Sequence, residues 1–160
     1  MSQPRGPSPH DVHARLTPVD LAIVAVLRRD ARTPNKAVAA EVGIAASTCL
    51  GRIRQLERRG VIRGYHADVD LPALGQHLQA MISVRVRAGA RHRLRGFTEQ
   101  IGALPEVRQL FFLGGDDDFL VHVAVPDAVA LREFVLDQLS SNPEVASTQS
   151  NVVFDHVQGW

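Results

Sequence analysis

The sequence predicts an α+β protein with an N-terminal helix-turn-helix domain and a C-terminal ferredoxin-like βαββαβ domain. Apolar residues recur at helical spacing over residues 16–60, and from Leu78 onward they alternate as in a half-buried strand. Charge divides near the same place, since residues 1–75 hold eleven Arg or Lys and seven Asp or Glu, whereas residues 76–160 hold seven and ten. We therefore expect a helical domain at residues 16–66, a linker at 67–77 and a second domain at 78–157.

Composition limits the class of protein. With 45% hydrophobic side chains, the 160 residues can bury one good core or two small ones. No apolar run approaches the roughly 20 residues that span a bilayer, and the Pro-, Gly- and Ser-rich residues 1–15 are typical of a disordered tail rather than a signal peptide. We expect a soluble, cytoplasmic protein with no membrane partner. Cys49 is the single cysteine and the seven histidines are scattered, so neither a metal site nor a cofactor is expected.

The first helix is expected to begin at Pro18. Thr17 is a favourable N-cap residue, Pro18 suits the first helical position, and the charge of Asp20 is stabilising near a helix N-terminus. An apolar stripe with the spacing of one helix face follows, formed by Val19, Ile23, Val26 and Leu27. These signals predict an amphipathic helix that turns a single face to the core.

Two short helices with a tight turn between them are expected next. Asn35 is expected to cap the second helix, and Gly43 is suited to its left-handed end. Gly60 ends the third helix, whose apolar face is expected to comprise Cys49, Leu50, Ile53 and Leu56. The opposite face is expected to comprise Thr48, Arg52, Gln55 and Arg59. Only Gly43, Ile44 and Ala45 separate the two helices, as in a helix-turn-helix.

The third helix has the charge of a DNA recognition helix, because residues 43–66 hold five arginines and one acid. The residues expected to meet base edges are Ser47, Thr48, Arg52 and Gln55. Those expected to hold phosphates are Arg54, Arg58, Arg59 and Arg63. The alternative is a solvated helical hairpin with ordinary surface arginines. Cys49, on the apolar face, is expected to be a packed core residue.

The second half of the chain predicts a sheet with two helices. Strands are expected at residues 78–88, 107–113, 119–125 and 145–154, and helices at 91–103 and 127–141. In this order they form a βαββαβ fold, in which both helices cover one face of the sheet. The other face also carries apolar strand residues, and leaving them in water would be unfavourable. We therefore expect a homodimer that pairs through the sheets, which also supplies two recognition helices for a palindromic DNA site.

The stretch FFLGGDDDFLVH, residues 111–122, places two glycines and three aspartates between two strands. A hairpin turn explains them without further function, because Gly and Asp tolerate turn conformations. Catalytic carboxylates would have to face one another across a cleft, and a closed Mg²⁺ or Ca²⁺ site needs more oxygen ligands. The fourth reading is an effector site, since an amino acid zwitterion needs a carboxylate for its ammonium and N–H groups for its carboxylate. His122 is either a pocket member or a hydrogen-bonded core or interface histidine, and the other expected residues are Gly115, Asp116, Asp118, Thr148 and Ser150.

Three stretches of the chain resemble the Lrp/AsnC family of bacterial and archaeal transcriptional regulators, the feast/famine proteins. They are VDLAIVAVLRRDAR, AAEVGIAASTCLGRIRQLERRGVIRGYHADVDLPALG and GGDDDFLVHV, and the resemblance extends in the right order over residues 16–155. It implies a winged-helix-like DNA-binding domain followed by an ACT-like domain, termed RAM, that pairs subunits into dimers and commonly into octamers. It also implies that the loop from Gly115 to Asp118 helps form an amino acid pocket at subunit interfaces.

Three residues depart from the pattern of that family. Ala45 stands where a capping serine is usual, which costs about 1 kcal/mol of helix stability. Gly51 stands where a larger side chain is usual in the recognition helix, so no base preference carries over. Asp117 stands where an aromatic or other bulky residue is frequent, so the shape of the pocket is expected to differ.

We interpret the chain as a sequence-specific regulator of transcription that binds double-stranded DNA and whose oligomeric C-terminal domain senses a small molecule, an amino acid. It is not expected to be an enzyme. Two alternatives stay open at this stage: an effector-independent architectural DNA-binding protein, and a small-molecule-binding regulator of an enzyme that does not bind DNA. DNA binding that weakens steeply with salt would exclude the second, because it reports phosphate contacts.

Overall fold

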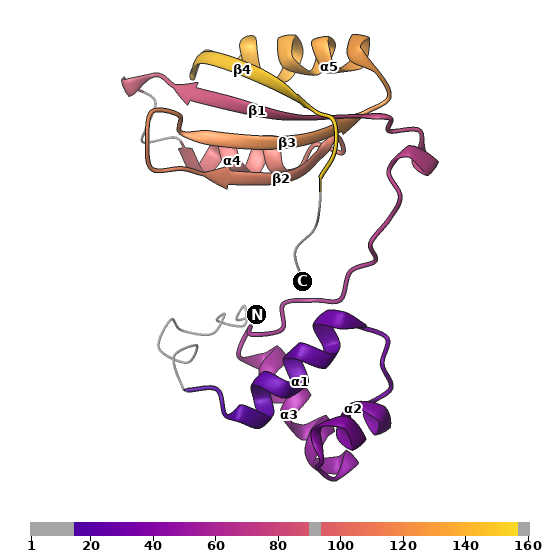
Figure 1. Cartoon of the computed structure of the whole chain (residues 1–160). Helices are drawn as coiled ribbons and strands as arrows, with labels where there is room; N and C mark the ends of the chain where they lie inside the picture. Colours follow the sequence, from indigo (N-terminus) through magenta and orange to yellow (C-terminus); the bar gives the residue numbers. More distant parts are fainter. Residues whose placement is uncertain (1–14, 90–93, 157–160) are drawn as a thin grey trace, which may run out of the picture. The chain divides into compact units, whose positions relative to one another are not determined.

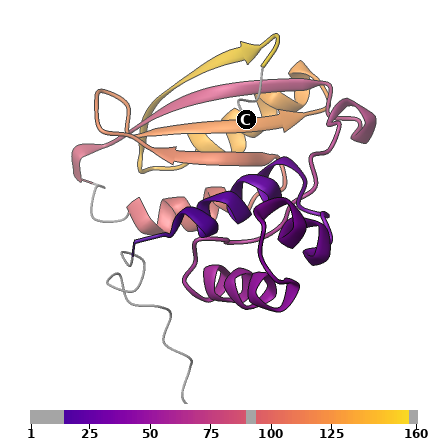
Figure 2. The ribbon, with the colours of Figure 1, turned by 60° about the horizontal axis from the view of Figure 1, so that its bottom comes forward.

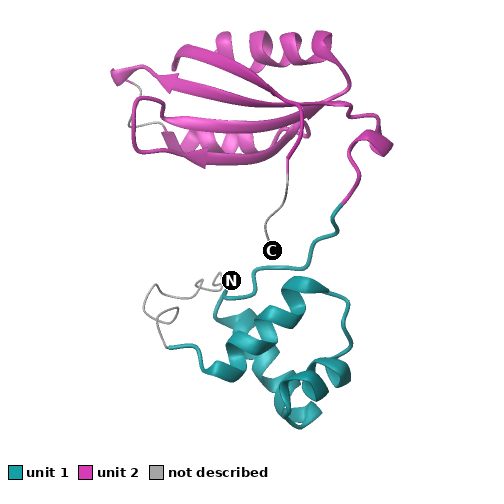
Figure 3. Cartoon of the chain, viewed as in Figure 1, with its two compact units in different colours: residues 1–68, 159–160 teal, residues 69–158 magenta. Residues whose placement is uncertain are grey.

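The chain divides at Asp68 into two units (Figure 3). Each unit has its own hydrophobic core. The structure, a computed structural model, describes residues 15–89 and 94–156. Residues 1–14 of the predicted tail, residues 91–93 of the predicted helix at 91–103 and residue 157 lie outside the described residues.

Residues 15–68 fold into three helices, α1 (Pro18–Arg29), α2 (Asn35–Val42) and α3 (Ala46–Arg58) (Figure 1). Each helix turns one side to a shared core, whose buried members are Ile23, Val26, Val38, Ala39, Cys49 and Leu56. Residues 43–45 alone connect α2 to α3. The predicted helix-turn-helix is confirmed, and so is Cys49 as a packed core residue.

Thr17 and Asp20 fix the start of α1, as the sequence predicts. The N–H of Asp20 donates to Oγ1 of Thr17 over 3.2 Å, and Oδ2 of Asp20 accepts from the N–H of Thr17 over 2.9 Å. This pair of reciprocal bonds is a capping box, which satisfies two backbone donors that a helix start leaves open. Gly43 ends α2 with φ of 76°, so the predicted left-handed stop is also confirmed.

The prediction that Asn35 caps α2 is wrong. Pro34 occupies the extended cap position without a side-chain hydrogen bond, and Asn35 is the first helical residue. From there, Nδ2 of Asn35 donates to the carbonyl of Ala46 over 2.8 Å. The side chain therefore joins the first turns of α2 and α3 instead of closing its own helix.

The prediction that Leu50 belongs to the core is also wrong, because 39% of this residue is exposed. Helix α3 is the last of three short helices around a narrow core. Two buried residues, Cys49 and Leu56, and the half-buried Ile53 between them fill the space that α1 and α2 leave. Leu50 lies at the margin of that stripe, where the helix already faces solvent.

Residues 69–89 and 94–156 form the second unit. Its main elements are β1 (Leu78–Val86), α4 (Leu94–Gly102), β2 (Val107–Phe112), β3 (Phe119–Val125), α5 (Ala128–Phe134) and β4 (Val145–Val153). A π-helical turn (Val135–Ser140) continues α5, and a short 3-10 helix, η1 (Pro72–Leu74), precedes β1. The strands lie side by side and antiparallel in the order β2-β3-β1-β4 (Figure 2). This order confirms the predicted ferredoxin-like βαββαβ fold.

One face of the sheet carries the core of this unit. Alternate residues of β1 are buried there against α4 and α5, and the cluster includes Ile82, Val84, Phe97, Ile101, Leu131 and Phe134. The open face carries a mixed set, in which Met81 and Leu120 are half-buried and Phe111 is 43% exposed. His122, also on this face, is hydrogen-bonded, since its Nε2 lies 2.9 Å from Oε1 of Gln79. None of the helices in residues 15–89 and 94–156 is long and apolar enough to cross a membrane.

The start of α3 yields a prediction about stability. Ala45 is the N-cap residue, with φ of −65° and ψ of 142°, and no side chain caps the helix. Ala45→Ser should raise the free energy of unfolding of the first unit by about 1 kcal/mol, because a serine Oγ accepts from the N–H groups of the first turn. Thermal unfolding followed by circular dichroism measures the change. Ala40→Ser, at an exposed position inside α2, is the control, and equal effects of the two substitutions would contradict the capping explanation.

Candidate functional sites

The exposed surface of α3 is the candidate DNA-binding face. Its outermost stripe has helical spacing and consists of Ser47, Gly51, Arg54 and Arg58, all exposed. Thr48 and Gln55 lie beside this stripe and are exposed too, as is Arg63 beyond the end of the helix. Six of the eight residues predicted to contact DNA are therefore exposed to solvent, and all six lie on α3 or on the segment that follows it.

The remaining two, Arg52 and Arg59, are half-buried. Nη1 of Arg52 donates to Oδ1 of Asp20 over 2.9 Å and to Oγ1 of Thr17 over 3.2 Å. The prediction that Arg52 lies on the face opposite the core is thus wrong, because its guanidinium reaches the N-terminus of α1. Arg52 lies three residues after Cys49 and four before Leu56, so helical spacing places it beside the buried stripe, and from there its long side chain reaches the neighbouring helix.

Asp20 is the acid that forms the ion pair with Arg52, and it is only 5% exposed. Burial raises the pKa of its carboxyl group, but the hydrogen bonds from the side chain and backbone of Thr17 and from Arg52 outweigh burial. The pKa of Asp20 therefore lies below its ordinary value. The pair is charged at neutral pH and joins α1 to α3 inside the DNA-binding unit.

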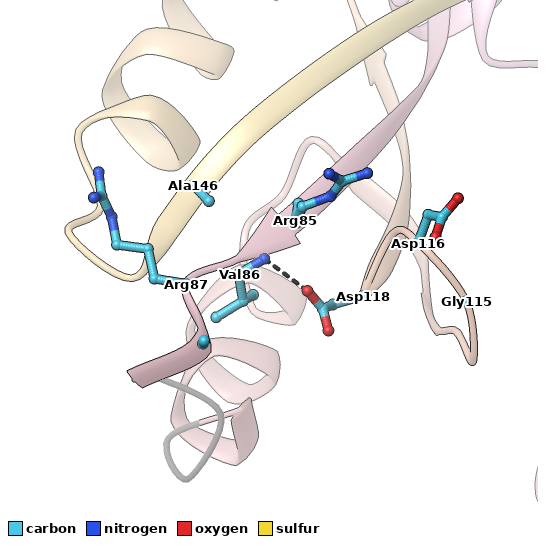
Figure 4. Close-up of a pocket in the computed structure, with 8 residues that line it drawn as sticks. Arg85, Val86, Arg87, Gly115, Asp116, Asp118 and Ala146 are labelled. Carbon is cyan, nitrogen blue, oxygen red and sulfur yellow. Dashed lines mark hydrogen bonds between the residues drawn. The ribbon is translucent and has the colours of Figure 1, made fainter.

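Asp118 ties the loop between β2 and β3 to the end of β1. Its side chain is buried, and Oδ2 accepts a hydrogen bond from the N–H of Val86 over 2.8 Å (Figure 4). Its own N–H donates to the carbonyl of Val84 over 3.0 Å, and its carbonyl accepts from the N–H of Leu113 over 2.8 Å. Asp118 therefore stabilises the loop, and this structural role is separate from any role in binding a ligand.

A pocket of about 410 Å³ opens beside Asp118. It brings together three predicted effector residues, Gly115, Asp116 and Asp118, with five others: Arg85, Val86, Arg87, Ala88 and Ala146. The two arginines flank Val86 at the end of β1 (Figure 4). Two acids, two arginines and small apolar residues thus line one opening, and this combination of residues suits a zwitterion with an apolar side chain.

Contacts hold the two arginines in place. Nη2 of Arg85 lies 3.7 Å from Oδ1 of Asp117, and Nε of Arg87 donates to the carbonyl of Val145 over 3.2 Å. Sequence reasoning missed both as pocket residues. Nothing in the local sequence brings them to the loop, because it is the pairing of Val84 with Phe119 that carries the end of β1 there.

Thr148 and Ser150, the other predicted effector residues, lie on β4. They pair with Val84 and Ile82 of β1, so they belong to the side of the sheet that the helices cover. Thr148 is half-buried and Ser150 is exposed. Neither lines the pocket at Asp118 in the described part of this single chain, and their role stays a prediction.

A basic helix-turn-helix unit followed by a ferredoxin-like unit with a charged pocket defines a class, the ligand-responsive transcriptional regulators. Residues 79–158 match the Lrp/AsnC ligand binding domain, and residues 16–57 match the AsnC-type helix-turn-helix domain. The HTH-type transcriptional regulator AldR of Mycolicibacterium smegmatis is 48% identical over 153 residues, which are 95% of this chain and 90% of AldR. The chain belongs to the Lrp/AsnC family, as its sequence predicts.

Solved structures agree with this assignment. The crystal structure of MtbAldR is similar with a TM-score of 0.82 and 43% identity, covering 92% of this chain and 98% of that one. A transcriptional regulator of Neisseria meningitidis in complex with L-Met has a TM-score of 0.81 and 32% identity, covering 91% and 94%. The chain is thus a transcriptional regulator with a DNA-binding and a ligand-binding domain, and it is not an enzyme. The two alternative functions are not favoured.

Replacing Asp118 tests its structural role. Asp118→Ala should lower the free energy of unfolding of the second unit by about 1–3 kcal/mol, because the buried N–H of Val86 loses its acceptor. Asp118→Asn keeps an acceptor oxygen and should cost less. Asp116→Ala, at an exposed position, is the control and should change stability by less than about 0.5 kcal/mol. Urea unfolding gives the three values, and a match between Asp118→Ala and the control would show that the hydrogen bond to Val86 contributes nothing.

Proposed function

We propose that two subunits of this regulator bind a roughly palindromic DNA site through α3. An amino acid bound beside the loop at residues 114–118 would set the affinity of the protein for that DNA site. The observation that carries the effector part is the mixed charge of the pocket at Asp118. We further propose that residues 67–77 are the linker between the DNA-binding domain and the effector-binding domain. The protein is proposed to act in the cytoplasm.

Ser47, Thr48 and Gln55 are the proposed base readers. All three are exposed, and each carries a hydrogen-bonding group on or beside the outer stripe of α3. Arg54, Arg58 and Arg63, also exposed, are the proposed phosphate contacts, and Arg59 completes this set.

The effector is proposed to be an amino acid in zwitterionic form. A guanidinium of Arg85 or Arg87 suits its carboxylate, and the carboxylate of Asp116 suits its ammonium. Val86, Ala88 and Ala146 offer small apolar surface for its side chain. The L-Met complex of the Neisseria meningitidis regulator supports this class of ligand. Thr148 and Ser150 stay in the proposal as residues that a neighbouring subunit presents.

The working form is proposed to be a homodimer that pairs through the open face of the sheet and assembles further to an octamer. Met81, Phe111 and Leu120 give that face apolar surface, which supports pairing between subunits. The octamer rests on the family resemblance. An effector at a subunit interface would then change the relative placement of two copies of α3, with a coupling free energy of about 1–3 kcal/mol.

The proposed phosphate contacts predict a salt dependence. Arg54→Ala and Arg58→Ala should each weaken binding to every duplex and should each reduce the slope of log K against log salt concentration by about 1, because one counterion fewer is released. Fluorescence anisotropy over a salt series measures the slope. Arg132→Ala removes the same charge from an exposed position of α5 and should leave it unchanged. A loss of affinity confined to one DNA sequence would contradict the phosphate assignment.

The proposed effector site predicts stabilisation by its ligand. An amino acid at about 100 times its Kd should stabilise the folded protein by about 2.7 kcal/mol, because it binds only the folded state. Thermal unfolding with each of the twenty amino acids identifies it. Arg85→Ala and Asp116→Ala should abolish the shift, whereas Asp137→Ala, an exposed acid in the π-helical turn, should preserve it. The proposal fails if no amino acid alters either the melting temperature or DNA binding.

A further inference from the structure

An ion pair with one buried end links α1 to α3 in the DNA-binding unit. The side chain of Asp20 is 8% exposed and that of Arg52 is 33% exposed, with 2.9 Å between Oδ1 and Nη1. A second pair in residues 15–68 offers a comparison: Arg29 and Glu41 join α1 to α2, but their side chains are 66% and 49% exposed. Water screens that exposed pair, whereas the pair at Asp20 is partly removed from water and its geometry matters more.

The two oxygens of Asp20 hold two different helices. Oδ2 accepts from the N–H of Thr17 over 2.9 Å and from Oγ1 of Thr17 over 2.7 Å, which fixes the start of α1. Oδ1 accepts from Arg52, which lies in the middle of α3. Because the capping box already orients this planar carboxylate, the position of the Arg52 guanidinium is determined by the start of α1.

Arg52 occupies the position on α3 where such a contact controls rotation of the helix. It lies one turn after Thr48 and one turn before Gln55, two of the proposed base readers. Successive residues of a helix are about 100° apart, so a turn of α3 by one residue step would replace the outer stripe with a different set of side chains. A contact that holds Arg52 on α1 prevents such a turn.

We propose that Thr17, Asp20 and Arg52 set the rotation of the recognition helix on α1, and that Arg52 is a positioning residue rather than a base reader. This inference rests on the DNA-binding role proposed for α3. For Arg52 to reach a base, its guanidinium would have to leave Asp20, and the carboxylate would stay behind, buried and without its cation. Ser47, Thr48 and Gln55 then carry the direct readout.

Asp20→Asn separates the two roles of Arg52. The asparagine oxygen can still accept from Thr17, but an NH₂ group replaces the oxygen that faces Arg52. The capping box is therefore retained and the ion pair between the helices is lost, while the 3.2 Å bond from Nη1 of Arg52 to Oγ1 of Thr17 can remain. The substitution also removes a negative charge from a basic unit, which on its own should strengthen binding to any DNA. The positioning role predicts the opposite for a preferred sequence, a loss of about tenfold in affinity.

The measurement uses the full chain and two duplexes of equal length. One is enriched from a random library by the wild-type protein, and the other has a scrambled sequence. Affinities are measured at a temperature where circular dichroism finds every variant folded, so that a loss of stability alone does not move the ratio. Glu41→Gln is the matched control, since it removes one acid from the same unit at the exposed pair, and it should leave the ratio of the two affinities unchanged.

Arg52→Gln should lower the same ratio by at least as much as Asp20→Asn, because it also removes the bond to Thr17. The double variant should be no worse than Arg52→Gln, because both substitutions remove the same ion pair. For the scrambled duplex, Arg52→Gln should keep the wild-type salt slope. A slope reduced by about 1 would mean that Arg52 contacts phosphate.

That reduced slope, or a ratio of the two affinities in Asp20→Asn equal to that of the wild type, would overturn the positioning role. Should Asp20→Asn not fold, the slope of Arg52→Gln decides the question alone. If the wild-type chain enriches no sequence, the DNA-binding proposal itself fails.

Discussion

Pairing along both edges of β1 determines the geometry of the second unit. This strand is hydrogen-bonded to β3 on one side and to β4 on the other, and every second residue from Ala80 to Val86 is buried. A slip of one residue would turn that buried set to the open face, so the core fixes the register strongly. The same register places the N–H of Val86 within reach of Asp118. The position of Asp118 in the pocket is thus a consequence of how the core packs.

The first unit depends on different physics. Its helices are short, and α2 has only eight residues. Helices shorter than about 12 residues are marginal in water, so contacts at their ends and between them carry much of the organisation. Thr17 and Asp20 at the start of α1, and Asn35 between α2 and α3, are contacts of this kind. A few polar side chains therefore supply the precision that six buried core residues would not provide by themselves.

Local signals in the sequence predicted the elements that they govern. Thr17 and Gly43 mark helix ends through backbone conformations and hydrogen bonds within a few residues, and the structure has them as expected. Alternation from Leu78 identified β1, because one face of the strand is buried. These features need no knowledge of what lies elsewhere in the chain.

Contacts distant in sequence were the ones that could not be predicted. Arg52 meets an acid 32 residues away, and although its spacing from Cys49 and Leu56 places it beside the core, no local pattern identifies Asp20 as its partner. Arg85 and Arg87 reach the loop only through strand pairing, and Leu50 is exposed because the core is narrower than the apolar stripe. The resemblance to a family supplied the position of the proposed effector loop, but not the two arginines that line the pocket beside it.

Gly51 gives the recognition helix an adaptable position. It stands in the outer stripe between Ser47 and Arg54, and a Cβ atom added there would meet nothing within 4 Å. A side chain at this site would project outward without disturbing the core, and replacing a glycine inside a helix gains up to about 1 kcal/mol of helix stability. A change in DNA preference at this position therefore carries no penalty in folding. With α3 on DNA as proposed, a single substitution at Gly51 would add a side chain to the DNA-facing surface and leave the core as it is.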